Sequence, residues 1–128
     1  RFPAHPQAPQ ALFMGGQCQV KRAETLAEAA KNEPKKAGMY QAQIRDAYHD
    51  AVESFVSLVE NHKDISNKEL LAQGLYWAGD CSFRLQDYAN AYIYLKRTTF
   101  EYPESKWARH ARGLLLQEAE AFDEVSGK

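Results

Sequence analysis

DAYHDAVESF at residues 46–55 recurs in related form at residues 86–95 as QDYANAYIYL. Equivalent residues stand 40 positions apart, and the clearest pairs are Tyr48 with Tyr88, Ala51 with Ala91 and Phe55 with Leu95. A small residue followed four positions later by a large apolar one lets two helices approach closely at one turn and interlock at the next. A repeat of this period indicates stacked helical hairpins in an all-α domain.

The composition is that of one folded domain. The chain has 128 residues, of which 45 % are apolar and 26 % are charged, so it can bury a core and does not have the composition of a disordered chain. The net charge is −1, and acids and bases are mixed without a basic face, so we expect no nucleic-acid partner. No apolar run approaches the roughly 20 residues that cross a bilayer, so we also expect no direct membrane span.

Five helical segments are predicted from apolar residues that recur three or four positions apart. They cover residues 8–31, 36–61, 66–85, 88–101 and 105–124. Ser66 with Glu69 matches a capping box at the start of the third helix. Asp87 and Ser105 can cap the fourth and fifth helices. The fifth helix becomes more polar towards its end, as the terminal helix of an array requires.

From these helices we predict that residues 1–128 form a single domain of helical hairpins. Residues 8–62 form a long first hairpin, residues 66–103 form a second, and residues 105–124 form a capping helix. Phe2-Pro3 is similar to Tyr102-Pro103, where the second hairpin closes, so residues 1–7 are predicted to end a preceding repeat. We therefore expect the chain to be part of a longer protein.

The two cysteines occupy equivalent places in the repeat, in Gly16-Gln17-Cys18 and Gly79-Asp80-Cys81. Equivalent positions face the same packing layer, so both are predicted to be small buried thiols. The alternative is a disulfide, which requires the two Cα atoms to lie within about 7 Å of each other. Axes of packed helices lie about 8–10 Å apart, which favours the free thiols.

No motif of catalysis, metal binding or phosphate binding is present in the sequence. His49, Asp50 and Glu53 could form a metal-binding face on one helix, but we favour the alternative, an exposed polar face. The carboxylate pairs Glu24 with Glu28 and Glu120 with Glu124 are typical of solvated helix surfaces. We therefore expect no enzyme, no metal and no cofactor.

Residues at fixed offsets in the second hairpin carry a family resemblance. A large apolar residue, a small contact residue, an alanine, a bulky residue and a closing proline are supplied by Leu75, Gly79, Ala91, Leu95 and Pro103. In these residues the chain resembles the tetratricopeptide-repeat family, whose hairpins stack as a right-handed superhelix. The segment 2–18 is similar to repeat junctions of bacterial cell-envelope members that serve the Tol–Pal system or outer-membrane β-barrel assembly. The resemblance alone implies an extracytoplasmic location.

The first hairpin departs from the family spacing. Gly16 and Ala51 are 35 positions apart, whereas Gly79 and Ala91 are 12 apart. The 23 extra residues keep helical periodicity, so we expect them to lengthen both helices of the first hairpin.

The resemblance also implies that the first helix of each hairpin lines a concave groove. The matching positions in the first hairpin are Gln10, Phe13, Gln17, Val20 and Lys21. Those in the second hairpin are Gln73, Tyr76, Asp80, Phe83 and Arg84. Aromatic and arginine side chains of this kind suit a peptide or a protein edge. For Phe13 and Phe83 the alternative is packing against the adjacent helices.

These features predict a non-catalytic scaffold or adaptor that binds another protein, as an assembly or maturation factor of a larger complex. The alternative is a self-assembly module, which extends a longer solenoid or forms a homo-oligomer through the long first hairpin.

Overall fold

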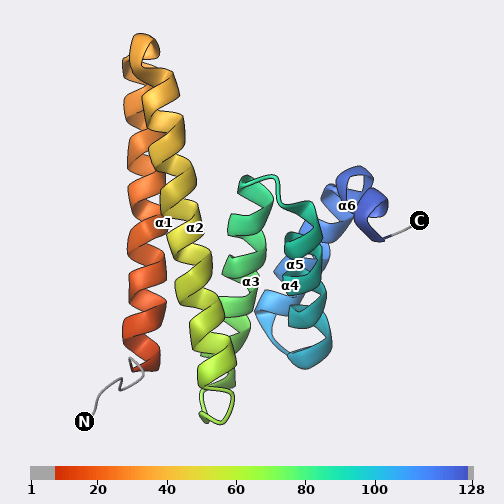
Figure 1. The fold of residues 1–128 in the computed structure, drawn as a ribbon. Helices are drawn as coiled ribbons and strands as arrows, with labels where there is room; N and C mark the ends of the chain where they lie inside the picture. Colours follow the sequence, from red (N-terminus) through yellow and green to blue (C-terminus); the bar gives the residue numbers. More distant parts are fainter. Residues whose placement is uncertain (1–7, 127–128) are drawn as a thin grey trace.

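Each helix of the chain packs against the next one along the sequence, as Figure 1 shows for this computed structural model. The structure describes residues 8–126. The helices are α1 (Pro9–Asn32), α2 (Ala37–Asn61), α3 (Lys68–Arg84), α4 (Tyr88–Glu101), α5 (Lys106–Gln117) and α6 (Ala119–Ser126), with a short 3-10 helix, η1 (Pro34–Lys36), between the first two. Residues 8–126 contain no strand, and the predicted all-α fold of stacked antiparallel hairpins is confirmed. Within this range no helix combines the length and the apolar character needed to cross a bilayer.

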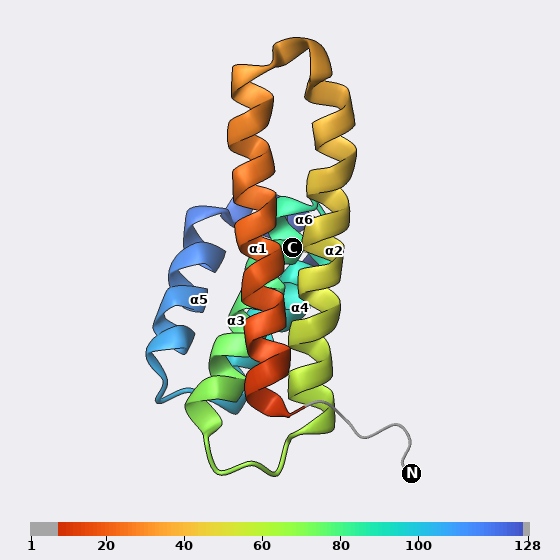
Figure 2. The same ribbon diagram turned by 90° about the vertical axis from the view of Figure 1, so that its left-hand side faces the viewer.

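The first hairpin is elongated as predicted. Helices α1 and α2 continue well beyond the other helices, and η1 closes the projecting end (Figures 1 and 2). The Tyr40 hydroxyl donates a hydrogen bond of 2.5 Å to the Glu33 carboxylate at this end. No side chain between residues 24 and 46 is buried, and among them Ile44 packs against the core, so the projecting part is held mainly by the pairing of its two helices.

The two hairpins are built around the same close contact. A Cβ atom added at Gly16 would lie 2.6 Å from the Phe55 ring, and one added at Gly79 would lie 2.7 Å from the Leu95 side chain. Real Cβ atoms do not approach other atoms so closely, so each large apolar side chain occupies the space that glycine leaves. The 40-residue correspondence of Phe55 with Leu95 is therefore structural.

The buried side chains form two clusters. The first lies between α1, α2 and α3 around Phe55 and Leu71, both fully buried. The second joins α4, α5 and α6 through Leu95, Ala111 and Phe122. Burying a phenylalanine such as Phe55 stabilises a fold by about 3–5 kcal/mol relative to alanine. The clusters explain why neighbouring hairpins hold together.

Side-chain caps mark the starts of α3, α4 and α5. The side chains of Asp87 and Ser105 accept hydrogen bonds from the backbone N–H groups of Asn90 (3.3 Å) and Trp107 (3.0 Å), as predicted. At α3, however, Asn67 is the cap and accepts from the Leu70 N–H at 3.1 Å. The predicted capping box of Ser66 and Glu69 is therefore wrong, because the chain enters the helix one residue later.

The predicted helix 105–124 is two helices. It breaks at Glu118, whose backbone leaves the helical region at φ −110° and ψ 35°, so residues 8–126 hold six α-helices where the sequence predicted five. After the break Phe122 turns onto the second cluster and is 2 % exposed, with its ring centroid 5.7 Å from that of Phe83 and 6.2 Å from that of Tyr92. Burial of Phe122 favours the break over a straight helix.

Helix α5 exposes two arginines at positions whose equivalents in α3 are buried. Arg109 and Arg112 stand 34 positions after Leu75 and Ala78, which are buried between α3 and its neighbours. Both arginines are exposed.

The cysteines do not share one environment. Cys81 is fully buried in the first cluster, as predicted. Cys18 is exposed, and the prediction that it is buried is wrong. Helix α3, which carries Cys81, is packed between α2 and α4, whereas α1 is packed mainly against α2 in the described part of the chain. Both thiols are free.

Candidate functional site: a groove along α1, α3 and α5

The first helices of the successive hairpins lie on one side of the molecule. In Figure 2, α3 and α5 lie to the left of α1, and α2 lies to its right. Helix α3 contacts α5 and, to a smaller extent, α1. The family resemblance implied a concave groove along α1, α3 and α5. This surface is called the groove below.

A hollow of about 180 Å³ lies in the groove between α1 and α3. It is lined by Gln17, Val20, Lys21, Glu24, Phe55 and Trp77. Its walls are apolar where Phe55, Val20 and Trp77 meet, and its rim carries one base and one acid. Such a hollow, here called the groove pocket, has the make-up of a site for one apolar side chain with polar groups around it.

Four aromatic rings continue this surface from α3 onto α5. Tyr76 and Trp77 of α3 meet Trp107 and His110 of α5, with ring centroids 5.3–6.4 Å apart. Tyr76, Trp77 and Trp107 are half-buried, and His110 is exposed. The Trp77 indole N–H is covered and donates to no acceptor within residues 8–126. These four rings are called the aromatic platform.

The structure brings some of the predicted groove residues together. Gln17, Val20 and Lys21 line the groove pocket, and Tyr76 belongs to the aromatic platform. Gln10 is exposed in the first turn of α1, outside both features. Gln73 is half-buried on α3, one turn before Tyr76.

Two predicted aromatic anchors pack against neighbouring side chains instead, Phe13 as a buried residue and Phe83 as a half-buried one. Phe13 is buried with its ring centroid 5.7 Å from that of Phe55. Phe83 lies 5.5 Å from Tyr88 and 5.7 Å from Phe122 between ring centroids. For both residues the structure shows the alternative, which is packing against adjacent helices.

Sequence reasoning missed Glu24, Trp77, Trp107 and His110. Trp107 and His110 stand 34 positions after Gln73 and Tyr76, both predicted groove residues. A repeat of 34 residues is typical of helix–turn–helix arrays, so this spacing could have found them. For Trp77 and Glu24 no comparable signal exists, because their positions are not groove positions in the pattern used.

Asp80 and Arg84 form an ion pair at the upper end of α3. The Arg84 Nε donates to Asp80 Oδ2 at 3.0 Å, and the Asp80 side chain is largely covered. Burial acts against the charge of Arg84, but the charge of Asp80 and this hydrogen bond raise the pKa of Arg84. The pair fixes the direction of the guanidinium.

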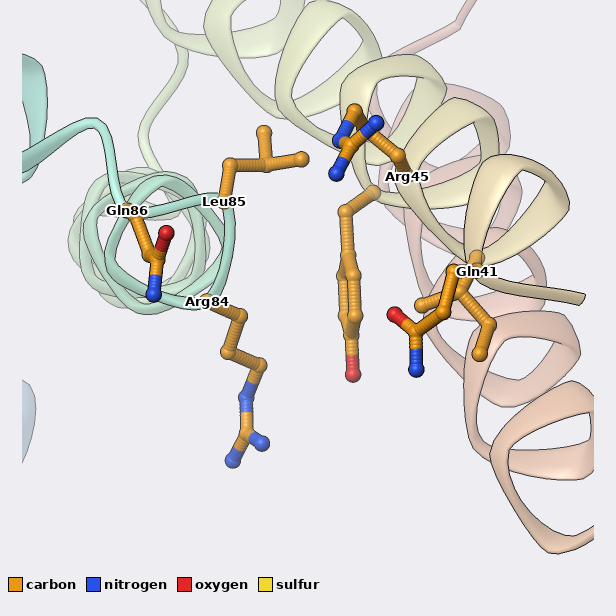
Figure 3. A pocket seen from close by; sticks show the side chains of 7 residues that line it. Gln41, Arg45, Arg84, Leu85 and Gln86 are labelled. Atoms are coloured by element: carbon orange, nitrogen blue, oxygen red, sulfur yellow. The ribbon is translucent and has the colours of Figure 1, made fainter. Parts of the chain in front are cut away.

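Arg84 also lines a second hollow of about 180 Å³, between α2 and the α3–α4 turn. It is called the notch pocket, and its lining is Gln41, Ile44, Arg45, Tyr48, Arg84, Leu85 and Gln86. Figure 3 shows Gln41 and Arg45 reaching from α2, and Arg84 extending from the end of α3 on the opposite side. Gln86 has φ 62°, in the left-handed region. Burial raises the pKa of the Tyr48 phenol.

A scan against protein-family models, a search of curated proteins and a search of solved structures each found no significant match. In the part of the chain from 8 to 126, no three His, Cys, Asp or Glu side chains gather as ligands of a metal ion would. His49, Asp50 and Glu53 are exposed on α2.

Proposed function

We propose that this chain is a non-catalytic helical-repeat scaffold that holds another protein in the groove. The observation that carries the proposal is the aromatic platform, which leaves three large rings half-exposed beside the groove pocket. Aromatic side chains dominate binding energy at protein interfaces because they offer a large contact area at a low entropy cost.

The surface chemistry suggests how a partner is recognised. The groove pocket accepts one apolar side chain, and the platform offers flat faces for a second. Lys21 and Glu24 at the rim can pair with charges of either sign on the partner, which favours orientation and association rate more than affinity. A peptide or a protein edge with an apolar anchor and flanking charges fits these features.

The test is capture of a specific protein from a native extract by the wild-type chain and by two charge-reversal variants. Lys21→Glu changes the rim of the groove pocket, whereas Lys35→Glu changes the projecting end of the first hairpin. Both side chains are exposed, so neither change should affect folding. We expect Lys21→Glu to reduce the captured partner, because reversal of a rim charge slows association, and Lys35→Glu to retain it. Equal capture by both variants would contradict the proposal.

A second candidate function, self-assembly, is favoured by a different surface. Ile93 and Phe100 of α4 and Leu116 of α5 are 50 %, 75 % and 79 % exposed. Leu116 lines a hollow with Tyr92 and Lys96, and the Lys96 ammonium lies 5.2 Å from the centroid of the Phe100 ring. Sedimentation of the purified chain at several concentrations tests this candidate. A concentration-dependent dimer that Leu116→Lys abolishes would support it, and a monomer throughout would exclude it.

The location and the biological role are proposed from the resemblance to cell-envelope repeat proteins. We place the protein outside the cytoplasm, as an assembly or maturation factor bound to a larger complex. Fractionation of source cells with an antibody to the chain tests the location, and recovery from the cytosol alone would contradict it.

A further inference from the structure

We propose that a second copy of this chain packs its helix α5 against helix α2 of the first copy, through stripes of opposite charge. The inference rests on the second candidate function, self-assembly, and names the surfaces that meet. None of the residues that it uses lines the groove pocket or belongs to the aromatic platform. It is therefore independent of the scaffold proposal.

Helix α5 carries a stripe of bases on its surface, called the basic stripe. Lys106, Arg109 and Arg112 follow one another at intervals of three residues, and all three are exposed in a helix that contains no acid. Residues three apart are neighbours on a helix surface, where like charges repel each other. Lys106 also stands in the first turn, where a cation opposes the helix dipole. The stability of α5 therefore does not account for these bases.

Helix α2 carries a complementary stripe of acids, called the acidic stripe. Asp46, Asp50 and Glu53 follow one another at intervals of four and three residues, and all three are exposed. They are also like charges on neighbouring turns, and Arg45, the base next to Asp46, lines the notch pocket. No residue of either stripe forms an ion pair within the described residues 8–126.

The two stripes do not meet within one chain. Among the described residues α2 and α5 share no contact, and α3 lies between them in both views (Figures 1 and 2). A second copy of the chain brings the stripes together in matching number. Because the contact joins different surfaces of the two copies, it can repeat from one copy to the next and build a row of chains.

The stripes match in length when the two helices run antiparallel. At about 1.5 Å per residue, the basic stripe spans about 9 Å and the acidic stripe about 10.5 Å, a difference that long basic side chains can absorb. This register places Lys106 opposite Glu53, Arg109 opposite Asp50 and Arg112 opposite Asp46.

The same register brings exposed apolar side chains to one end of the contact. Leu116 lies one turn beyond Arg112 and is 79 % exposed, and Met39 lies two turns beyond Asp46 and is 51 % exposed. Apolar burial supplies affinity, whereas complementary charges fix the orientation and exclude wrong partners. The charges thus decide which surfaces pair.

The test is sedimentation equilibrium of the purified chain and of two charge-reversed variants at low salt. Arg109→Glu with Arg112→Glu makes the basic stripe acidic, and Asp46→Lys with Asp50→Lys makes the acidic stripe basic. Each variant alone should associate at least about tenfold more weakly than the wild-type chain, because ion pairs are replaced by repulsions. An equimolar mixture of the two variants should associate as the wild-type chain does, since their reversed stripes attract each other.

A matched variant controls for net charge. Arg22→Glu with Lys35→Glu makes the same change of net charge on the first hairpin and should leave association unchanged. All substituted side chains are exposed, so the variants should fold, and far-ultraviolet circular dichroism checks this. Association of the wild-type chain should weaken as salt rises from about 0.02 M to about 0.5 M, because salt screens exposed charges.

Three results would overturn the proposal. One is a wild-type chain that stays monomeric up to about 1 mM at low salt, and another is a mixture of the two reversed variants that stays monomeric. The third is association that survives in both reversed variants and is lost only in Leu116→Lys, which would leave self-assembly standing and exclude the contact of α2 with α5. Capture of a partner in the groove does not depend on any of these results.

Discussion

At the scale of single residues, glycine decides how closely the helices pair. Gly16 and Gly79 sit against Phe55 and Leu95, whereas Gly113, 34 positions after Gly79, has no atom within 4 Å of an added Cβ. The sequence predicted the first two contacts, because a small residue and a large one recur at fixed offsets. It could not show that Gly113 lies open, since that depends on whether another helix packs beside it.

Because Gly79 is closely packed and Gly113 is open, replacing each with alanine should have opposite effects on stability. Gly79→Ala should destabilise the fold by about 1–3 kcal/mol, because the methyl group would overlap Leu95 and overpacking has this cost. Gly113→Ala should stabilise it by about 0.5–1 kcal/mol, because alanine is the better helix former in open space. Urea unfolding measures both. Equal effects of the two changes would contradict the packing described.

Gln86 is a second residue whose backbone matters. Gln86→Gly should raise the free energy of unfolding by about 1 kcal/mol, because a left-handed conformation costs a non-glycine residue about 1–2 kcal/mol. Gln73→Gly, within α3, should instead lower it by about 1 kcal/mol. The same denaturation experiment checks both, and a loss of stability in Gln86→Gly would show that its side chain is worth more than the strain.

Cys81 should make the fold sensitive to alkali. Burial raises the pKa of its thiol to about 12, from 9.0 when exposed. As the pH rises, the unfolded chain therefore loses this proton before the folded chain does. The contribution of the thiol to the free energy of unfolding is complete below pH 9, and above pH 9 the free energy of unfolding falls by about 1.4 kcal/mol per pH unit. Tyr48 and Tyr76, whose pKa values burial also raises, act in the same direction above pH 10.

Unfolding at pH 8 and pH 10 compares the wild-type chain with two variants. Cys81→Ala should lose part of this pH dependence, although its stability at pH 8 is lower because a buried side chain is shortened. Cys18→Ala should keep it, because Cys18 is exposed. Identical slopes in all three proteins would contradict the assignment.

At the scale of helices, the apolar pattern and the capping residues predicted most helix boundaries correctly. The other boundaries depend on the path of the chain in three dimensions. The predicted range 88–101 of α4 is the observed one, because Asp87 and Pro103 mark both sides. Ser66 and Asn67 are both good caps, and the choice depends on the path of the loop after α2, where the Ile65 N–H bonds to the His62 carbonyl. The break in the last helix follows from the burial of Phe122, a long-range contact that periodicity does not reveal.

The projecting part of the first hairpin should open more readily than the body. No side chain between residues 24 and 46 is buried, whereas nine residues of α3 are. Local opening is easiest where few apolar contacts must be broken. Hydrogen exchange should therefore be faster for amides within 26–44 than for those within 71–82. Equal protection in both segments would show that the projecting part is held by contacts beyond the pairing of α1 and α2.

At the scale of the whole molecule, the arrangement of α1, α3 and α5 makes the candidate site. The order of hairpins predicted which helices share the groove, and Gln17, Val20, Lys21 and Tyr76 lie there. The sequence could not tell that Phe13 is buried, that Phe83 packs half-buried against the second cluster, or that Trp77 faces the groove pocket. These directions depend on how neighbouring helices tilt and on the positions of Phe55 and Phe122, which no local pattern fixes.

The most direct measurement is site-specific photocrosslinking in a native extract. A photoreactive phenylalanine replaces Gln17 in the groove or Glu53 on α2, both exposed in the free chain. If the groove holds a partner, light should produce one adduct of defined mass from position 17 and none from position 53. An adduct from position 53 alone, or none from either position while a partner is captured, would contradict the groove as the binding site.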